Sequence, residues 1–464
     1  MLGFYMRVRK AFLVTTLVFL TLWARVPVTA QTETTESILI RITEYLSAFE
    51  YEQAIALFDT IAYPERASSQ LRLLEASVLS SAGKFDEARV IVEAVSAEEP
   101  NNTEALLILA AIEGVLGRTR QQQLVLERII AIEPDNVEAL VSLGNISLGN
   151  RNIRSAASQF HRALTAEPGN SGALLGLGRA FRINQEWEDA ELYLSHAVQL
   201  HPDMAEAWIE RARLYRLRGF LLQALEDLDQ AKRIAPNDYW ITIDRGNLLL
   251  DMNRRTLALE EFNRAIEINP GEFLAYVFSS GLKDEFGDRE GAERDYEILI
   301  RLRPDYYFAF EGLGLHKMRQ GQWAEAREAF MEAYRQAPNE HLYALLAAIN
   351  WMHLEGLAAP RAFLGQVITR VPRDSIEWSM FRLFHDLTAR NFLGETDMVV
   401  RLDRETDENL KAQMLFYMAM YYEVRGNTNL ANRYFLLAYE LNVRAIPEWR
   451  LMDWILTDRN LKPF

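Results

Sequence analysis

The sequence predicts an all-α solenoid of stacked helix hairpins, on the basis of a proline series and an apolar pattern in phase with it. Proline cannot continue a helix, and it biases the preceding residue away from helical geometry. Nine of the fourteen prolines follow one another at intervals of 34 residues, a period typical of repeat architectures. They are Pro100, Pro134, Pro168, Pro202, Pro236, Pro270, Pro304, Pro338 and Pro372. Each proline therefore closes one repeat at the same phase.

The apolar pattern describes two helices in every repeat. When each proline is position 32 of its unit, apolar or small residues recur at positions 4, 7, 8 and 11, and again at 20, 24 and 27. These spacings form two helical faces separated by a turn. In the unit 137–170, the small residues Gly144 and Ala156 let the two helices approach, while Leu140 and Phe160 fill the space between neighbouring units. Each unit is expected to be a helix hairpin.

The expected starts of the first helices carry capping residues. Asn101 stands three residues before Glu104, and Asp135 stands three residues before Glu138. This spacing is typical of the capping box, in which a polar side chain bonds the first free backbone N–H groups of a helix. We therefore expect Asn101 and Asp135 to cap their helices.

The spacing and the residue identities resemble those of the tetratricopeptide repeat family. The resemblance implies a right-handed superhelical solenoid whose first helices line a concave groove. Ten units keep register over 35–374, a degenerate hairpin is expected at 375–411, and another unit at 412–445. With a C-terminal capping helix within 446–464, the chain is expected to contain about twelve hairpins of 34 residues.

The amino terminus has the features of a secretory signal peptide over residues 1–30. Arg7, Arg9 and Lys10 precede an apolar run over 11–23, and small residues lead to Ala30. Such a run is short for a membrane span, so we expect cleavage after Ala30, with an uncleaved anchor as the alternative. No second apolar run of spanning length follows. The expected location is extracytoplasmic, in the periplasm, with no integral membrane span after cleavage.

The charge and the cysteine content exclude several classes of partner. The chain has 50 basic and 65 acidic residues, a net charge of −15, and loss of the four basic residues in 1–30 would leave −19. Such a field repels nucleic acid and anionic lipid, so neither is expected as a partner. Cysteine is absent, which excludes disulfides, thiolate metal sites and cysteine-linked lipids.

No catalytic or metal-binding constellation is recognisable in the sequence. The seven histidines form no pair with metal-ligand spacing, and the paired glycines near residues 176 and 312 lack the third glycine and the preceding strand of a dinucleotide loop. The carboxylates are scattered over expected solvated faces. We assign no catalytic residue, metal or cofactor, and we do not expect an enzyme.

A polar cluster is expected in the groove. By the family resemblance, positions 2, 5, 6, 9, 12 and 13 of the first helices face it. Six hydrogen-bond donors there would form a pad for carboxylates of an acidic segment or a chain terminus. Alternatively, Glu210, Asp244 and Asp251 could neutralise the arginines. The six residues are Asn145, Arg179, Arg182, Arg213, Arg216 and Asn247.

An apolar strip occupies the same groove positions in later units. Exposed apolar strips with methionines are typical of adaptable binding surfaces. Alternatively, the irregular segment 375–411 could cover this strip. Its members are Leu274, Val277, Phe308, Leu315, Met318, Leu342, Leu345, Ile349 and Met352, and Trp240 is a further candidate for partner contact.

These features favour a non-catalytic scaffold or adaptor of the cell envelope that binds a partner protein or an extended peptide in its groove. The stretch from Leu415 to Leu451 is similar to the end of NlpI-type envelope tetratricopeptide proteins, although the chain lacks a lipid-bearing cysteine. An alternative is an accessory subunit that binds a ligand or cell-wall fragment for a transporter or hydrolase, which would need a closed pocket rather than an open groove. An enzyme with an unfamiliar site on the inner surface is a third possibility.

Overall fold

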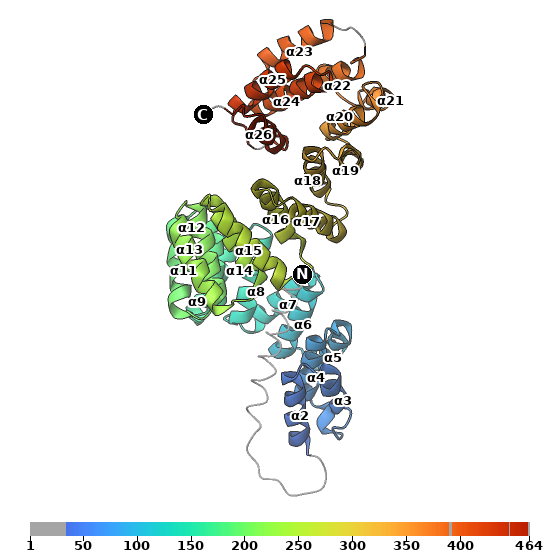
Figure 1. The fold of residues 1–464 in the computed structure, drawn as a ribbon. Helices are drawn as coiled ribbons and strands as arrows, with labels where there is room; N and C mark the ends of the chain where they lie inside the picture. Colours follow the sequence, from blue (N-terminus) through green and yellow to red (C-terminus); the bar gives the residue numbers. More distant parts are fainter. Residues whose placement is uncertain (1–33, 389–391, 445, 463–464) are drawn as a thin grey trace. The chain divides into compact units, whose positions relative to one another are not determined.

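The computed structural model describes residues 34–388, 392–444 and 446–462, and all regular structure in these ranges is helical (Figure 1). The expected signal peptide, 1–30, lies outside the described residues. The chain divides into two compact units, one ending at Ala235 and the other beginning at Pro236. Within the described ranges, no helix has the length and apolar character needed to cross a membrane. The predicted all-α solenoid of helix hairpins is confirmed.

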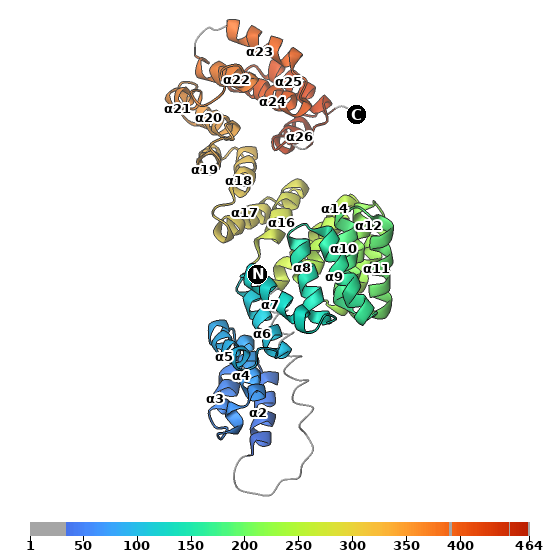
Figure 2. The same cartoon turned by 180° about the vertical axis from the view of Figure 1, so that it is seen from behind.

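The N-terminal unit consists of six successive hairpins. The two helices of each hairpin pack together, and each second helix also packs on the first helix of the next hairpin, as Figures 1 and 2 show for α8–α13. The helices are α2 (Thr35–Ser47), α3 (Tyr51–Phe58), α4 (Ser69–Ala82), α5 (Phe85–Glu98), α6 (Thr103–Val115), α7 (Thr119–Ile132), α8 (Val137–Gly149), α9 (Ile153–Ala166), α10 (Ser171–Ile183), α11 (Trp187–Leu200), α12 (Ala205–Leu217) and α13 (Leu221–Ile234), with a short 3₁₀ helix, η1 (Glu65–Ala67).

Small residues at position 8 allow the close packing that the pattern predicted. A Cβ atom added to Gly144 of α8 would lie 2.5 Å from the Phe160 ring of α9, which is closer than real Cβ contacts. Ala156 and Phe160 are fully buried in the same hairpin. The ring therefore fills the space that the glycine leaves, and each unit is packed as a closed pair of helices.

The helix caps lie one residue later than expected. The side chain of Asn136, rather than that of Asp135, accepts a hydrogen bond from the backbone N–H of Ala139 at 3.0 Å. Its amide Nδ2 donates to Glu133 at 2.8 Å. Asn102 has the same two bonds, so the prediction of Asn101 was also wrong. An asparagine amide both accepts and donates, and it therefore joins the new helix to the end of the preceding one.

The C-terminal unit begins with the same pattern and then changes. Its first three hairpins are regular, whereas α20 pairs with a short α21, and α22 and α25 both pack on α24 (Figure 1). The helices are α14 (Tyr239–Asp251), α15 (Arg255–Ile268), α16 (Phe273–Phe286), α17 (Arg289–Leu302), α18 (Tyr307–Arg319), α19 (Trp323–Gln336), α20 (Leu342–Glu355), α21 (Arg361–Val367), α22 (Ile376–His385), α23 (Phe392–Arg404), α24 (Glu408–Val424), α25 (Thr428–Glu440) and α26 (Trp449–Asp458).

The tenth unit departs from the regular hairpin because its second helix is half the usual length. Helix α21 has 7 residues, whereas α19 in the preceding unit has 14. Pro360 stands at position 20, which is usually a small helical residue, and it is the N-cap residue of α21. Since proline in a helix interior breaks a backbone hydrogen bond and clashes with the preceding turn, the helix starts only after it.

Candidate protein-binding surfaces

The predicted arginines meet on two neighbouring first helices of the N-terminal unit. Arg179 and Arg182 lie on α10, and Arg213 and Arg216 lie on α12, which packs beside α10. The repeat period places Arg179 and Arg213 at the same position of successive units, so the two helices present one continuous arginine surface. We use this name for these four residues.

A buried glutamate joins three of these arginines. The side chain of Glu210 on α12 is 4% exposed, and its Oε1 lies 3.1 Å from Nε of Arg179 and 3.0 Å from Nη1 of Arg213. Its Oε2 lies 3.5 Å from Nη2 of Arg182, and Arg179 also pairs with Glu206. The alternative that Glu210 neutralises part of the cluster is therefore correct, and the arginines are not a pad of free donors.

The arginine surface stays partly accessible to solvent. Arg213 is 44% exposed although it pairs with Glu210, and Arg179 is 29% exposed although it pairs with Glu206 and Glu210. The side chains of Arg179, Arg182 and Arg213 are thus paired with carboxylates without being fully buried. This arrangement can bind a further carboxylate.

Two exposed apolar side chains stand beside the arginine surface. Ile183 is 49% exposed and Leu217 is 61% exposed, at the C-terminal ends of α10 and α12. Both occupy position 13 of their units, so the same 34-residue period that identified the arginines would have identified them. The sequence analysis missed these two residues. Asn145, on the preceding first helix α8, is also exposed.

The two remaining groove candidates near the start of the C-terminal unit lie on α14. Trp240 is exposed, and its ring lies edge-on to that of Tyr239 with centroids 5.1 Å apart. Asn247 is half-buried. Trp240 is therefore accessible, as expected for a contact residue.

Much of the predicted apolar strip is core rather than exposed surface. Leu345 and Ile349 are 0% exposed, and Met318 and Met352 are also buried. Helix α20 lies against α24, and the two helices share one hydrophobic core. The cover thus comes mainly from α24, which begins at Glu408, and only partly from 375–411. Leu342 and Leu315 are half-buried, and Phe308 remains 49% exposed.

Phe308 and Leu315 line a cleft in the C-terminal unit, which we call the C-terminal cleft. It has a volume of about 350 Å³ and lies between α16, α18 and the segment 444–451. The residues from α16 and α18 occupy groove positions of two successive units. The cleft is lined by Val277, Gly281, Asp284, Tyr296, Phe308, Glu311, Gly312, Leu315, Arg319, Arg444, Ile446, Pro447, Arg450 and Leu451.

Two carboxyl groups belong to this region: the half-buried Glu311 lines the cleft, and the buried Glu448 lies next to lining residue Pro447. Glu311 accepts a hydrogen bond from the Tyr343 hydroxyl, and Glu448 accepts one from the Tyr417 hydroxyl at 2.7 Å. Burial raises the pKa of Glu311 to about 7, the Tyr343 hydrogen bond opposes this shift, and Glu448 adds to it. Burial also raises the pKa of Glu448. Glu311 therefore changes its charge close to neutral pH.

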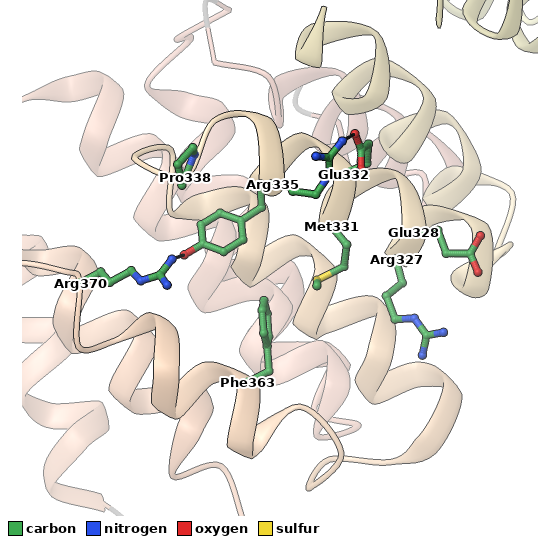
Figure 3. Close-up of a pocket in the computed structure, with 9 residues that line it drawn as sticks. Arg327, Glu328, Met331, Glu332, Arg335, Pro338, Phe363 and Arg370 are labelled. Atoms are coloured by element: carbon green, nitrogen blue, oxygen red, sulfur yellow. Dashed lines mark hydrogen bonds and ion pairs between the residues drawn. The ribbon is translucent and has the colours of Figure 1, made fainter. Parts of the chain in front are cut away.

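A second hollow lies beside the short helix α21. It has a volume of about 520 Å³ between α19 and α21, and Figure 3 shows Phe363 of α21 pointing toward α19. Its arginines bond within the chain, since Arg327 pairs with Glu355 at 3.1 Å and Arg335 with Glu332. Arg370 donates to the Tyr334 hydroxyl at 3.4 Å. This hollow consequently offers less unpaired charge than the C-terminal cleft.

Comparison with protein families explains the repeated hairpins. Three profiles of the tetratricopeptide repeat match the chain, one over 45–112, one over 141–204, 184–239 and 283–341, and one over 243–272. The chain contains tetratricopeptide repeats. Tetratricopeptide repeat proteins typically mediate protein–protein interactions, and their fold is generally non-catalytic. A comparison with curated protein sequences gives no match.

Solved structures of other tetratricopeptide repeat proteins resemble parts of the chain. One from Parabacteroides merdae is 17% identical and covers 53% of this chain and 98% of its own, with a TM-score of 0.45. PilF of Pseudomonas aeruginosa is 20% identical and covers 44% and 92%, with a TM-score of 0.39. PilW, a type IV pilus biogenesis factor, is 21% identical and covers 43% and 93%, with a TM-score of 0.40.

Proposed function

We propose that this tetratricopeptide repeat protein is a non-catalytic adaptor of the bacterial cell envelope that binds an acidic segment of a partner protein on its arginine surface. The observation that carries the proposal is the convergence of three arginines of two neighbouring first helices, Arg179, Arg182 and Arg213, on the buried Glu210 in a chain of net charge −15. An acidic partner segment is attracted to this surface and repelled by most of the rest of the chain.

The exposed apolar side chains extend this surface. Ile183 and Leu217 adjoin the arginines on the same two helices. A segment that carries acidic and apolar side chains in alternation can place carboxylates on Arg213 and Arg216 and apolar groups on Ile183 and Leu217. Charge-assisted hydrogen bonds contribute roughly 1.5–3 kcal/mol each, and apolar contacts add to them.

The decisive experiment compares two double variants of equal charge change. Arg213→Glu/Leu217→Ala alters the surface on α12, whereas Arg233→Glu/Leu222→Ala makes the same changes at exposed positions of the second helix α13. Partners captured from the native envelope are identified by mass spectrometry, purified and titrated against each variant. We expect one partner that binds the wild type and the α13 variant and loses at least tenfold in affinity for the α12 variant. Equal affinity for both variants would refute the proposal.

The envelope location is tested separately. Mass spectrometry of the protein recovered from a periplasmic fraction is expected to find an amino terminus at Gln31, as cleavage after Ala30 requires. Recovery only from the cytoplasm with residues 1–30 intact would refute the adaptor's envelope role while leaving the arginine surface to be judged by its own titration.

A further inference from the structure

We propose that the C-terminal cleft is a second binding site, which takes the carboxyl-terminal residue of a partner chain. The apolar side chain of that residue lies against the wall made by α16 and α18, and its carboxylate pairs with Arg450. The site shares no residue with the arginine surface. Arg444 stands at the end of the last predicted unit, 412–445, and Arg450 lies beyond it on α26, so the repeats alone do not form the site.

The apolar walls come from both sides of the cleft. Val277, Phe308 and Leu315 contribute from the first helices, and Ile446 and Leu451 contribute from the C-terminal segment. Phe308 is 49% exposed, which is unusual for a phenylalanine that faces a concave surface. An apolar side chain that entered between these walls would remove the Phe308 ring from water and gain the corresponding hydrophobic free energy.

Arg450 supplies a cation at the cleft wall, and its charge opposes the rise in pKa that burial causes in the neighbouring Glu311 and Tyr296. Among the residues that the structure describes, no hydrogen bond or ion pair holds its guanidinium group, whereas Arg319 pairs with Asp284 at 3.3 Å and lies over the Trp454 ring. Nε of Arg444 donates a hydrogen bond to the amide oxygen of Asn442 at 3.2 Å. A Cβ atom on Gly281 would lie 2.7 Å from Nη1 of Arg450. The glycine thus lets the guanidinium lie against α16 at the cleft wall.

The size of the cleft favours a chain end over an internal segment. Its volume of about 350 Å³ is at the lower end of the range of roughly 300–1,000 Å³ for ligand sites. An internal acidic residue would require the chain to continue on both sides, between α18 and the segment 444–451. A terminal residue needs space on one side only, and its α-carboxylate matches the planar guanidinium. Glu311 opposes this carboxylate less than an ordinary glutamate would, because its pKa is about 7.

The test uses three short peptides as probes: Ac-Ala-Ala-Leu with a free carboxylate, the same peptide as its amide, and Ac-Ala-Asp-Ala-amide. Binding to the full chain is measured by calorimetry. We expect the free acid to bind at least tenfold more tightly than either amide. Equal binding of the free acid and its amide, equal binding of the internal aspartate, or absence of binding by the free acid would each overturn the proposal.

Variants locate the carboxylate. Arg450→Gln is expected to weaken the free acid about tenfold and leave the amide unchanged, whereas Arg289→Gln, at an exposed position of α17, should change neither. Gly281→Ala keeps the charge of Arg450 but displaces its guanidinium, so it should also weaken the free acid. Unchanged binding of the free acid in both cleft variants would overturn the proposal. The Arg213→Glu/Leu217→Ala variant should bind the peptide normally, which separates this site from the arginine surface.

Discussion

Glu311 makes the stability of the C-terminal unit depend on pH in a direction opposite to that of most salt-bridged carboxylates. Its pKa is about 7 in the folded protein because burial disfavours the charged form, compared with an ordinary value of 4.5. Between these two values the unfolded chain has lost the proton that the folded chain still holds. The free energy of unfolding therefore falls as pH rises through this window, and the full loss is reached above the folded pKa.

The size of the effect follows from the shift. A difference of about 2.5 pKa units corresponds to about 3 kcal/mol over the whole titration, of which about 2.5 kcal/mol falls between pH 5 and pH 8. Glu311→Gln removes the titration and keeps an oxygen that can accept the hydrogen bond of the Tyr343 hydroxyl. We expect this variant to gain stability relative to the wild type as pH rises, by up to this amount.

The assay is urea unfolding at pH 5, 6, 7 and 8, followed by tryptophan fluorescence and by amide hydrogen exchange in α18 and α26. Glu297→Gln removes an exposed carboxylate of α17 and serves as the control, for which we expect no change with pH relative to the wild type. If the Glu311→Gln and wild-type stabilities stay parallel from pH 5 to pH 8, Glu311 is already ionised at pH 5 and the burial argument is wrong.

Three further substitutions, each compared with a control substitution, test the packing, the arginine surface and the caps. The quantity measured is the free energy of unfolding in urea. Gly144→Ala is expected to destabilise by about 1–3 kcal/mol because its Cβ meets the Phe160 ring, whereas Gly149→Ala, which meets nothing within 4 Å, should be neutral or stabilising; equal effects would contradict the close packing. Glu210→Gln is expected to cost about 3 kcal/mol because it leaves three arginines without their buried partner, and Glu188→Gln, whose side chain is 85% exposed, should cost almost nothing. Asn136→Ala is expected to cost about 1 kcal/mol and Asp135→Ala less, and the reverse order would restore the cap predicted from the sequence.

The repeat period predicted most of the fold because it repeats the same local physics in every unit. Proline at position 32, small residues at position 8 and apolar residues at position 24 each have a fixed structural consequence, and the structure shows them in Gly144 and Phe160. The cap prediction failed because Asn and Asp both suit a helix start, and sequence spacing does not say which of two adjacent polar residues turns its side chain to the helix. Pro360 at position 20 is a sequence signal for the truncation of α21, and the sequence prediction did not use it.

The candidate sites were less predictable because they depend on contacts that the period does not encode. The period placed Arg179 and Arg213 side by side, but it could not establish that Glu210 between them is buried and bonds to both. The C-terminal cleft needs Arg444, which follows the last helix of the final unit, and Arg450 of α26, and neither occupies a groove position of a first helix. The hydrogen-exchange and peptide-binding measurements are therefore most informative in the C-terminal unit.

Position 9 of the first helices shows how one repeat position acquires three different roles. In α12 it is Arg213, which faces solvent beside Glu210; in α18 it is Leu315, which lines the C-terminal cleft; and in α20 it is Ile349, which is fully buried. The repeat places all three side chains at the same position of their first helices. The surroundings of these side chains depend on later parts of the chain. Residues from 446–451 line the cleft beside α18, and α24 packs against α20. Removal of α24 would expose Ile349 to water, so the helices after α21 stabilise the end of the repeat array as well as shape its cleft.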